Sequence, residues 1–213
     1  YELLVILGAA TGALIISNPP HVLKAVKSGF PQLLKKSGHD RQAYLEILSV
    51  MYELFMRSRR GGMLTLESHV ENPDESYIFQ QYPKLMSDHH YAVTFLTDYL
   101  RLMVGGNMNS FELDNLMDIE IATHEHETEQ PANALSTMSD GLPGFGVVAA
   151  VMGIVITMGS LDGPVDETGA HLAAALVGTF LGILLAYGFV GPFASALRHI
   201  AEDETIMLNC VKT

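Results

Sequence analysis

Residues 141–161 read GLPGFGVVAAVMGIVITMGSL, and residues 168–197 read TGAHLAAALVGTFLGILLAYGFVGPFASAL, without one Asp, Glu, Lys or Arg in either stretch. A third uncharged stretch, LLVILGAATGALIISNPP, covers residues 3–20. A helix rises about 1.5 Å per residue, so about 20 apolar residues cross the roughly 30 Å hydrocarbon layer of a membrane. The 21- and 30-residue stretches meet this length, and the 18-residue stretch comes close to it. The sequence therefore predicts three transmembrane helices.

The alternative is that these stretches are buried helices in the core of a soluble protein. A core helix of such length normally carries a polar stripe, and residues 146–159 and 172–190 carry none. Small residues also recur four apart, a spacing that lets helix backbones approach closely inside a membrane. These observations favour a packed bundle of membrane helices. The small-residue pairs are Gly8 with Gly12, Ala149 with Gly153, and Gly178 with Gly182.

The composition excludes several other classes of protein. It is 48% hydrophobic and only 17% charged, which is unlike a disordered chain. The 12 Lys and Arg against 24 Asp and Glu give a net charge of −12, so a basic protein that binds nucleic acid is excluded. The single cysteine, Cys210, allows no internal disulfide and no metal site built from cysteines alone.

The placement of basic residues predicts the topology. Five Lys and Arg lie between residues 24 and 41, whereas the link between the second and third stretches is acidic. By the positive-inside rule, the long insert and the tail are then cytoplasmic and the short link faces outward. Tyr1 would lie outside, so we expect an upstream transmembrane helix that pairs with the first span. The predicted segments are transmembrane helices over 1–20, 141–161 and 168–197, a cytoplasmic helical domain over 21–140, an external loop over 162–167 and a cytoplasmic tail over 198–213.

The insert is predicted to be helical, because it lacks the alternating pattern of strands. Apolar residues recur three and four apart after Asp40, which can cap a helix, and Gly61-Gly62 ends the pattern.

A second helix is predicted to begin at Asn109 and Glu112, which resemble a capping box. Pro131 and Pro143 are expected to bend or restart this helix on its way to the membrane.

Charge is segregated within the insert. Residues 21–60 hold 8 basic and 3 acidic groups, and residues 61–140 hold 2 basic and 14 acidic groups. Most of these charges are explained by a basic segment near lipid that is followed by a solvated acidic surface. The exception is the cluster of Arg57, Arg59 and Arg60 beside the glycine turn, with Glu67 just beyond it. Opposite charges that flank an exposed turn suit charge-steered contact with a partner.

Residues 123–127, THEHE, invite a metal site. On a helix, His124 and His126 point about 200° apart and cannot chelate one ion as an i, i+4 pair can. The chain also lacks the phosphate-binding loop and the serine nucleophile elbow. We therefore expect no enzymatic activity, no resident metal and no cofactor. A metal-regulated membrane scaffold that uses the two histidines remains an alternative.

The three uncharged stretches contain no carboxylate. Their polar side chains are mainly hydroxyls, among them those of Thr157 and Thr179, and such hydroxyls commonly bond to a carbonyl of their own helix. If this protein conducts protons, the titrating group in the membrane must therefore come from another polypeptide.

Several motifs together resemble the flagellar stator family of motility protein A (MotA). The resemblance covers nearly the whole chain, which relative to that family lacks the first of four transmembrane helices and much of the tail after Thr213. It implies an all-α, polytopic transmembrane bundle in the bacterial inner membrane, with a helical cytoplasmic domain before the last two spans. The motifs are Arg59-Arg60-Gly61-Gly62-Met63 with Glu67, Glu71-Asn72-Pro73-x-Glu75-Ser76, LPGFGVVAAVMG over 142–153, and GTFLGILLAYG over 178–188.

The resemblance implies a proton-conducting stator subunit that converts ion-motive force into torque on the flagellar rotor. In the family, five copies surround two copies of motility protein B (MotB), whose single membrane helix carries the proton-accepting Asp. The cytoplasmic domain pushes on the rotor protein FliG. The proton is the only transported ion that the resemblance implies. The implied partners of this chain are motility protein B, FliG and membrane lipid.

The resemblance also assigns roles to individual residues. Arg59 and Glu67 match the charged pair that contacts the rotor, and Arg60 stands beside them. In the membrane, Pro143 and Pro192 match prolines at the cytoplasmic ends of the third and fourth family helices, which couple ion passage to movement.

Three further residues fall on the implied ion pathway. Thr179 matches a hydroxyl that faces the partner's Asp, and Thr157 supplies another hydroxyl. Ala150 stands where sodium-driven relatives carry Thr. Because a methyl group cannot replace an oxygen ligand of sodium, Ala150 favours protons.

The nearest alternative is the related family of TolQ and ExbB, which energises outer-membrane processes. Its three-span topology with an external N-terminus fits the chain as it stands. The Glu71-Asn72-Pro73 stretch and the basic glycine turn favour the flagellar subunit.

Overall fold

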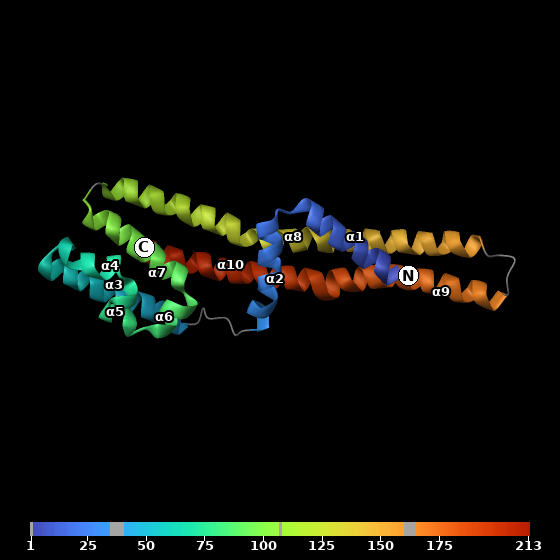
Figure 1. Ribbon diagram of the computed structural model, residues 1–213, viewed down its shortest axis with the longest axis horizontal. Coiled ribbons are helices and arrows are strands. Elements are labelled where there is room, and N and C mark those ends of the chain that lie inside the picture. The colour runs from blue at the N-terminus through green and yellow to red at the C-terminus, as the bar shows by residue number, and fades with distance from the viewer. Residues whose placement is uncertain (1, 35–40, 107, 160–164) are drawn as a thin grey trace. The chain divides into compact units, whose positions relative to one another are not determined.

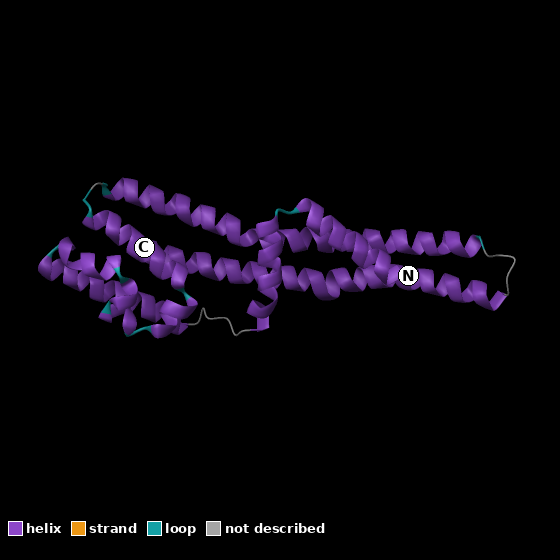
Figure 2. Cartoon of the chain, in the orientation of Figure 1, coloured by secondary structure: helices purple, strands orange, loops and turns teal. Residues whose placement is uncertain are grey.

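The computed structural model describes residues 2–34, 41–106, 108–159 and 165–213. Every regular element within these ranges is a helix (Figures 1 and 2), so the expected all-α class is confirmed. The α-helices are α1 Glu2–Ser17, α2 Pro20–Leu34, α3 Arg41–Gly61, α4 Glu67–Glu71, α5 Tyr77–Gln80, α6 Pro83–Asp88, α7 His90–Val104, α8 Ser110–Met158, α9 Val165–Leu185 and α10 Gly191–Lys212. The 3₁₀ segments η1 Met63–Leu66 and η2 Pro73–Glu75 and the π-helical segment η3 Ala186–Val190 complete them.

The chain divides into two compact units. The first unit contains residues 1–35 and 129–199, and the second contains residues 36–128 and 200–213. Two long helices, α8 and α10, contribute residues to both units.

The first unit contains the apolar helices. Within the described residues, α8 and the helical run Leu172–Lys212 are long and apolar enough to span a membrane, and only 28% and 22% of their most apolar windows are buried within the chain. Such exposure of apolar surface argues against the core of a soluble protein. The third apolar helix, α1, has 16 residues, which is about 24 Å. That α1 crosses the membrane, and where the membrane boundaries fall, stay predictions.

Glycine allows α8 and α9 to pack backbone against backbone. A Cβ at Gly182 would stand 2.7 Å from the carbonyl oxygen of Leu142 and 2.9 Å from the Cα of Gly146. Two turns away, a Cβ at Gly153 would stand 2.8 Å from the Cβ of Ala175. The close approach predicted from the small residues of these two helices is therefore confirmed.

The third small-residue pair behaves differently. At Gly8 and Gly12 in α1, nothing lies within 4 Å of the position that a Cβ would take. This side of α1 therefore makes no close contact with the described part of the chain.

The start of α8 is the predicted capping box. The N–H of Glu112 donates to Oδ1 of Asn109 at 2.9 Å, and the N–H of Asn109 donates to Oε2 of Glu112 at 3.2 Å. This reciprocal pair satisfies two backbone donors that the first helical turn leaves without partners.

The expectation that Pro131 or Pro143 restarts this helix is wrong, because α8 runs unbroken for 49 residues. A proline removes one hydrogen bond and crowds one carbonyl. The turns on both sides of each proline remain helical, so these local losses do not end the helix.

The second unit has a core of its own, built from α3 to α7, the first part of α8 and the end of α10. The apolar pattern predicted for α3 is only half buried: Ile47 is fully buried, whereas Tyr52 is 66% exposed. The helix ends at Gly61, as predicted. Asp40, its expected N-cap, lies outside the described residues. The largest fully buried side chains of this core include Ile47, Leu54, Leu66, Ile78, Phe79, Leu85 and Phe95.

We expect Gly182→Ala to destabilise the α8–α9 pair. The new methyl group would stand against backbone atoms of Leu142 and Gly146 that cannot rotate away, and overpacking of this kind costs about 1–3 kcal/mol. Thermal unfolding of the purified protein in detergent measures the effect. The matched control is Gly144→Ala in α8, where no atom of the described residues lies within 4 Å of the Cβ position. Equal unfolding temperatures for the two variants would contradict the assigned contact.

Candidate functional site

The charged turn predicted from the sequence lies at the junction of α3 and α4. Arg59 and Arg60 occupy the last turn of α3, and Glu67 is the first residue of α4. All three side chains are exposed. Gly62 between them has φ of 83°, a left-handed conformation that glycine adopts without steric cost. The sequence thus presents opposite charges on either side of one tight, glycine-dependent turn.

Arg57, which the sequence groups with these charges, is engaged by an aromatic ring. Its guanidinium lies 4.7 Å from the centre of the Tyr77 ring, a cation–π arrangement. The Tyr77 ring in turn meets the His69 ring edge-on, with ring centres 5.3 Å apart. Arg57 therefore fastens α3 to α5 and differs in its surroundings from Arg59 and Arg60.

Arg101 of α7 holds the far end of α4 through two contacts and makes a third within its own helix. Its Nε lies 3.0 Å from Oε1 of Glu71, its Nη2 donates to the carbonyl of Val70 at 2.8 Å, and its Nη1 lies 2.6 Å from Oδ1 of Asp98. The planar guanidinium presents several donors in fixed directions, so it orients α4 as well as neutralising two carboxylates. Sequence reasoning missed this residue, although the spacing of Asp98 and Arg101 places both on one helix face.

A buried histidine lies beneath the charged turn. His69 in α4 is 8% exposed, and its Nδ1 lies 2.9 Å from Oγ of Ser76. Burial lowers the pKa of His69, and the nearby Arg57 guanidinium lowers it further. The imidazole is thus kept neutral in the folded protein at neutral pH, and it supports the turn by packing and hydrogen bonding.

The predicted ion-pathway residues lie on α8 and α9 of the first unit, and Thr179 lies at the contact between these helices. Ala150 is 8% exposed and Thr157 is 2% exposed. The Thr157 hydroxyl donates to the carbonyl of Gly153 in its own helix at 2.8 Å, as expected for such hydroxyls. Thr179 is half-buried on α9, where its Cα would stand 3.3 Å from a Cβ at Gly146.

The two prolines, Pro143 and Pro192, differ in solvent exposure within the first unit. Pro143 is half-buried within α8, three residues before Gly146, and Pro192 is exposed at the second residue of α10. Directly before α10 lies η3, a π-helical segment that the sequence did not reveal. Ser139, four residues before Pro143, donates to the carbonyl of Ala186 in η3 at 2.9 Å.

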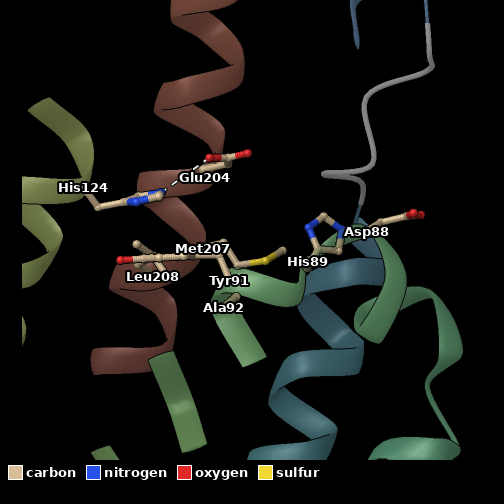
Figure 3. Close-up of a pocket in the computed structure, with 8 residues that line it drawn as sticks. All are labelled: Asp88, His89, Tyr91, Ala92, His124, Glu204, Met207 and Leu208. Atoms are coloured by element: carbon tan, nitrogen blue, oxygen red, sulfur yellow. Dashed lines mark ion pairs between the residues drawn. The ribbon is translucent and has the colours of Figure 1, made fainter. Parts of the chain in front are cut away.

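The second unit also contains a small pocket, shown in Figure 3. Nε2 of His124 lies 3.5 Å from Oε2 of Glu204, and the His124 ring stacks on Tyr91 with centres 3.8 Å apart. His126 is exposed, and Asp88 points away from the His124–Glu204 pair (Figure 3). Among the described residues, no three His, Cys, Asp or Glu side chains are placed to hold one ion. The two histidines of the THEHE stretch therefore have separate surroundings.

Comparison with known proteins identifies the family. The profile of the MotA/TolQ/ExbB proton channel family matches residues 88–209, and the profile of the motility protein A N-terminal region matches residues 1–62. The chain belongs to the MotA/TolQ/ExbB proton channel family. It is thus a member of a family of membrane proteins, and the resemblance inferred from its motifs is confirmed.

Relatives within this family carry flagellar names. The chain is 48% identical to motility protein A of Salmonella typhimurium and 47% identical to that of Escherichia coli, in each case over 99% of this chain and 71% of the relative. It is 41% identical to chemotaxis protein LafT of Vibrio parahaemolyticus, over 99% of this chain and 74% of the relative. These matches favour the flagellar branch of the family over the TolQ and ExbB branch.

Solved structures of family members share the fold. The C. jejuni MotAB structure matches 99% of this chain and 75% of its own chain, with a TM-score of 0.75 and 23% identity. The flagellar MotAB stator complex of Bacillus subtilis matches 99% of this chain and 77% of its own, with a TM-score of 0.73 and 26% identity.

We expect His69 to make the protein sensitive to acid. Because the folded pKa is lowered from 6.5, the unfolded state takes up a proton first as the pH falls, and stability present above pH 6.5 is lost below it. His69→Gln keeps a polar group near Ser76 but removes the titration. Its unfolding temperature should fall less than that of the wild type from about pH 7.5 to about pH 5. The control is His90→Gln, at an exposed histidine of α7. If the unfolding temperatures of the wild type and His69→Gln fell in parallel with pH, the role of His69 in acid sensitivity would be refuted.

Proposed function

We propose that this chain is a proton-conducting stator subunit of the bacterial flagellar motor in the inner membrane, converting ion-motive force into torque on the rotor. The observation that carries the proposal is the α8–α9 pair: two apolar helices in backbone contact at Gly146 and Gly182, with no carboxylate in residues 141–161 or 168–197. An ion pathway along such helices needs a titrating group from another chain. Relatives named motility protein A support the same assignment.

The proposed partner is motility protein B, the second component of the related MotAB stator complex. A single membrane helix of this partner, bearing an Asp, would supply the titrating group. Five copies of this chain surround two copies of the partner in the proposed assembly. The exposed apolar surfaces of α8, α9 and η3 then face the partner, neighbouring copies and membrane lipid.

The proposed ion is the proton. Thr179 offers a hydroxyl to the partner's Asp, and Thr157 contributes a second hydroxyl on α8. Sodium needs a shell of oxygen ligands to replace its water, and the buried methyl group of Ala150 offers none. Pro143 and Pro192 mark the places where α8 and the α9–α10 run can change shape, because each lacks the N–H that would complete its helix.

The proposed rotor contact is the charged turn, with FliG as the rotor protein. Arg59, Arg60 and Glu67 are exposed on both sides of Gly62, and Arg101 anchors the end of α4 behind them. Because Arg101 fixes the end of α4, the turn can transmit force through its exposed charges without being displaced.

A deletion strain that keeps its flagella tests this function. We expect loss of flagellar rotation without the protein and restored swimming when the protein is expressed with its single-span partner. Swimming should persist at low external sodium and stop when the proton gradient is collapsed. Failure only at low sodium would overturn the choice of ion. Normal swimming of the deletion strain with impaired outer-membrane uptake would support the TolQ and ExbB alternative instead.

We expect charge reversal at the turn to weaken torque more than neutralisation does. Exposed charge pairs contribute only about 0.2–1 kcal/mol each, so Arg59→Gln should be tolerated. The double variant Arg59→Glu with Glu67→Lys replaces attraction by repulsion at both positions and should stop most cells from swimming, while the protein stays in the membrane. Lys84→Glu, an exposed reversal on α6, is the control. Normal swimming and FliG binding by the double variant would show that the contact is not electrostatic.

A further inference from the structure

The buried hydrogen bond between Ser139 and Ala186 joins the two helical runs that contain Pro143 and Pro192. Ser139 is 5% exposed and lies on α8, four residues before Pro143. Its Oγ donates to the carbonyl of Ala186 at 2.9 Å. Ala186 is the first residue of η3, which leads into α10 and Pro192.

The carbonyl of Ala186 accepts a second hydrogen bond from its own chain. In an α-helix it would accept the N–H of Val190, but in η3 it accepts the N–H of Gly191, five residues on. The carbonyl oxygen of Ala186 therefore accepts two hydrogen bonds, one from the N–H of Gly191 in the π-helical turn and one from the Ser139 hydroxyl. A π-helical turn of this kind is rare and commonly lies at functional sites.

Each proline leaves a backbone carbonyl close to this bond in the sequence without its helical donor. Pro143 has no N–H, so the backbone carbonyl of Ser139 loses its donor four residues ahead, and Pro192 likewise leaves a carbonyl of η3 without its helical partner. Unpaired backbone groups cost several kcal/mol in a membrane, and serine hydroxyls and local π-helical turns are among the means that compensate them. The Ala186 carbonyl is neither of the two that the prolines leave without a donor, so the Ser139 hydroxyl does not replace a lost bond. It ties α8 to η3 beside both of them.

The fit around this bond is close. A Cβ at Gly191 would stand 3.0 Å from the carbonyl oxygen of Ala186 and 3.3 Å from Oγ of Ser139. Glycine at this position lets the start of α10 pass directly over the hydrogen bond.

We propose that Ser139 is a positioning residue that sets the helical register between α9 and α10. The π-helical segment accommodates one residue more than an α-helix would, so its conversion to α-helix would turn α10 about 100° relative to α9 and shift it about 1.5 Å. The Ser139 hydroxyl holds the π register and thereby fixes the direction in which Pro192 is presented. The functional effect of this register rests on the proposed stator function. In a stator, the register at Pro192 governs how ion passage moves the helices.

Ser139→Ala tests the proposal in the protein expressed with its partner. Loss of one hydrogen bond of about 1 kcal/mol changes an equilibrium about fivefold, and we expect proton flux and torque per assembled complex to fall about fivefold. The matched control is Thr137→Ala on the same helix, where the exposed hydroxyl donates only to the carbonyl of Asn133 in its own helix, at 3.0 Å. That variant should behave as the wild type.

A pair of variants of equal shape separates the hydrogen bond from packing. Ser139→Thr keeps the hydroxyl and Ser139→Val replaces it by a methyl group, so both add the same bulk. We expect Ser139→Thr to retain more flux per complex than Ser139→Val. Equal flux for this pair, wild-type flux in Ser139→Ala, or a loss confined to the amount of complex would each overturn the positioning role.

Hydrogen exchange tests the register without relying on the proposed function. In Ser139→Ala, the amide of Gly191 should exchange faster than in the wild type and in Thr137→Ala, because its acceptor is no longer held in place. Unchanged exchange at Gly191 would refute the inference. A wild-type protein that shows the hydrogen bond but fails to restore motility would refute the stator function instead and leave the register assignment intact.

Discussion

The contact of Gly146 with Gly182 is the constraint on which the arrangement of the first unit depends. Inside a membrane the hydrophobic effect does not press helices together, so association relies on close packing and polar contacts. A Cβ at either glycine would come within about 3 Å of backbone atoms of the facing helix. The absence of side chains at Gly146 and Gly182 lets the backbones of α8 and α9 approach closely. Ala149 and Gly153 on α8 and Gly178 on α9 extend this contact. Thr179 and Ala150 are neighbours of that face, so the glycines also influence where the proposed ion-pathway residues stand.

The second unit meets a different requirement, which is to hold a charged turn rigidly at a surface. Its core buries Leu66 and Val70 on either side of Glu67, and Arg57 and Arg101 fasten the segments before and after the turn. The exposed charges of the turn are thus placed on a packed support. Exposed ion pairs are weak individually, so the geometry of the support matters more to the proposed rotor contact than the strength of any single pair.

Much of this could be predicted from residues alone because the relevant signals are local. The uncharged stretches, the capping box at Asn109 and Glu112 and the glycine turn at Gly61-Gly62 each depend on neighbours within a few positions. Other features escaped prediction because they join distant segments. Nothing near Arg101 in the sequence indicates Val70, and nothing near Ser139 indicates Ala186, which lies 47 residues away. The restart expected at Pro131 or Pro143 was wrong because a local cost was weighed without the long helix that absorbs it, whereas a bend at these prolines stays a prediction.

The sequence by itself determined the all-α class, the apolar helices, the family and the absence of a carboxylate from residues 141–161 and 168–197, since composition and short-range pattern are enough for each. Only the tertiary structure decided which small residues are used, with Gly146 and Gly182 in contact and Gly8 and Gly12 free of close neighbours within the described residues. It alone also revealed the π-helical turn before Pro192 and the Ser139 hydroxyl that holds it. The physical reason is that hydrogen bonds and backbone contacts between helices depend on rotation and register, which hydrophobic periodicity leaves open.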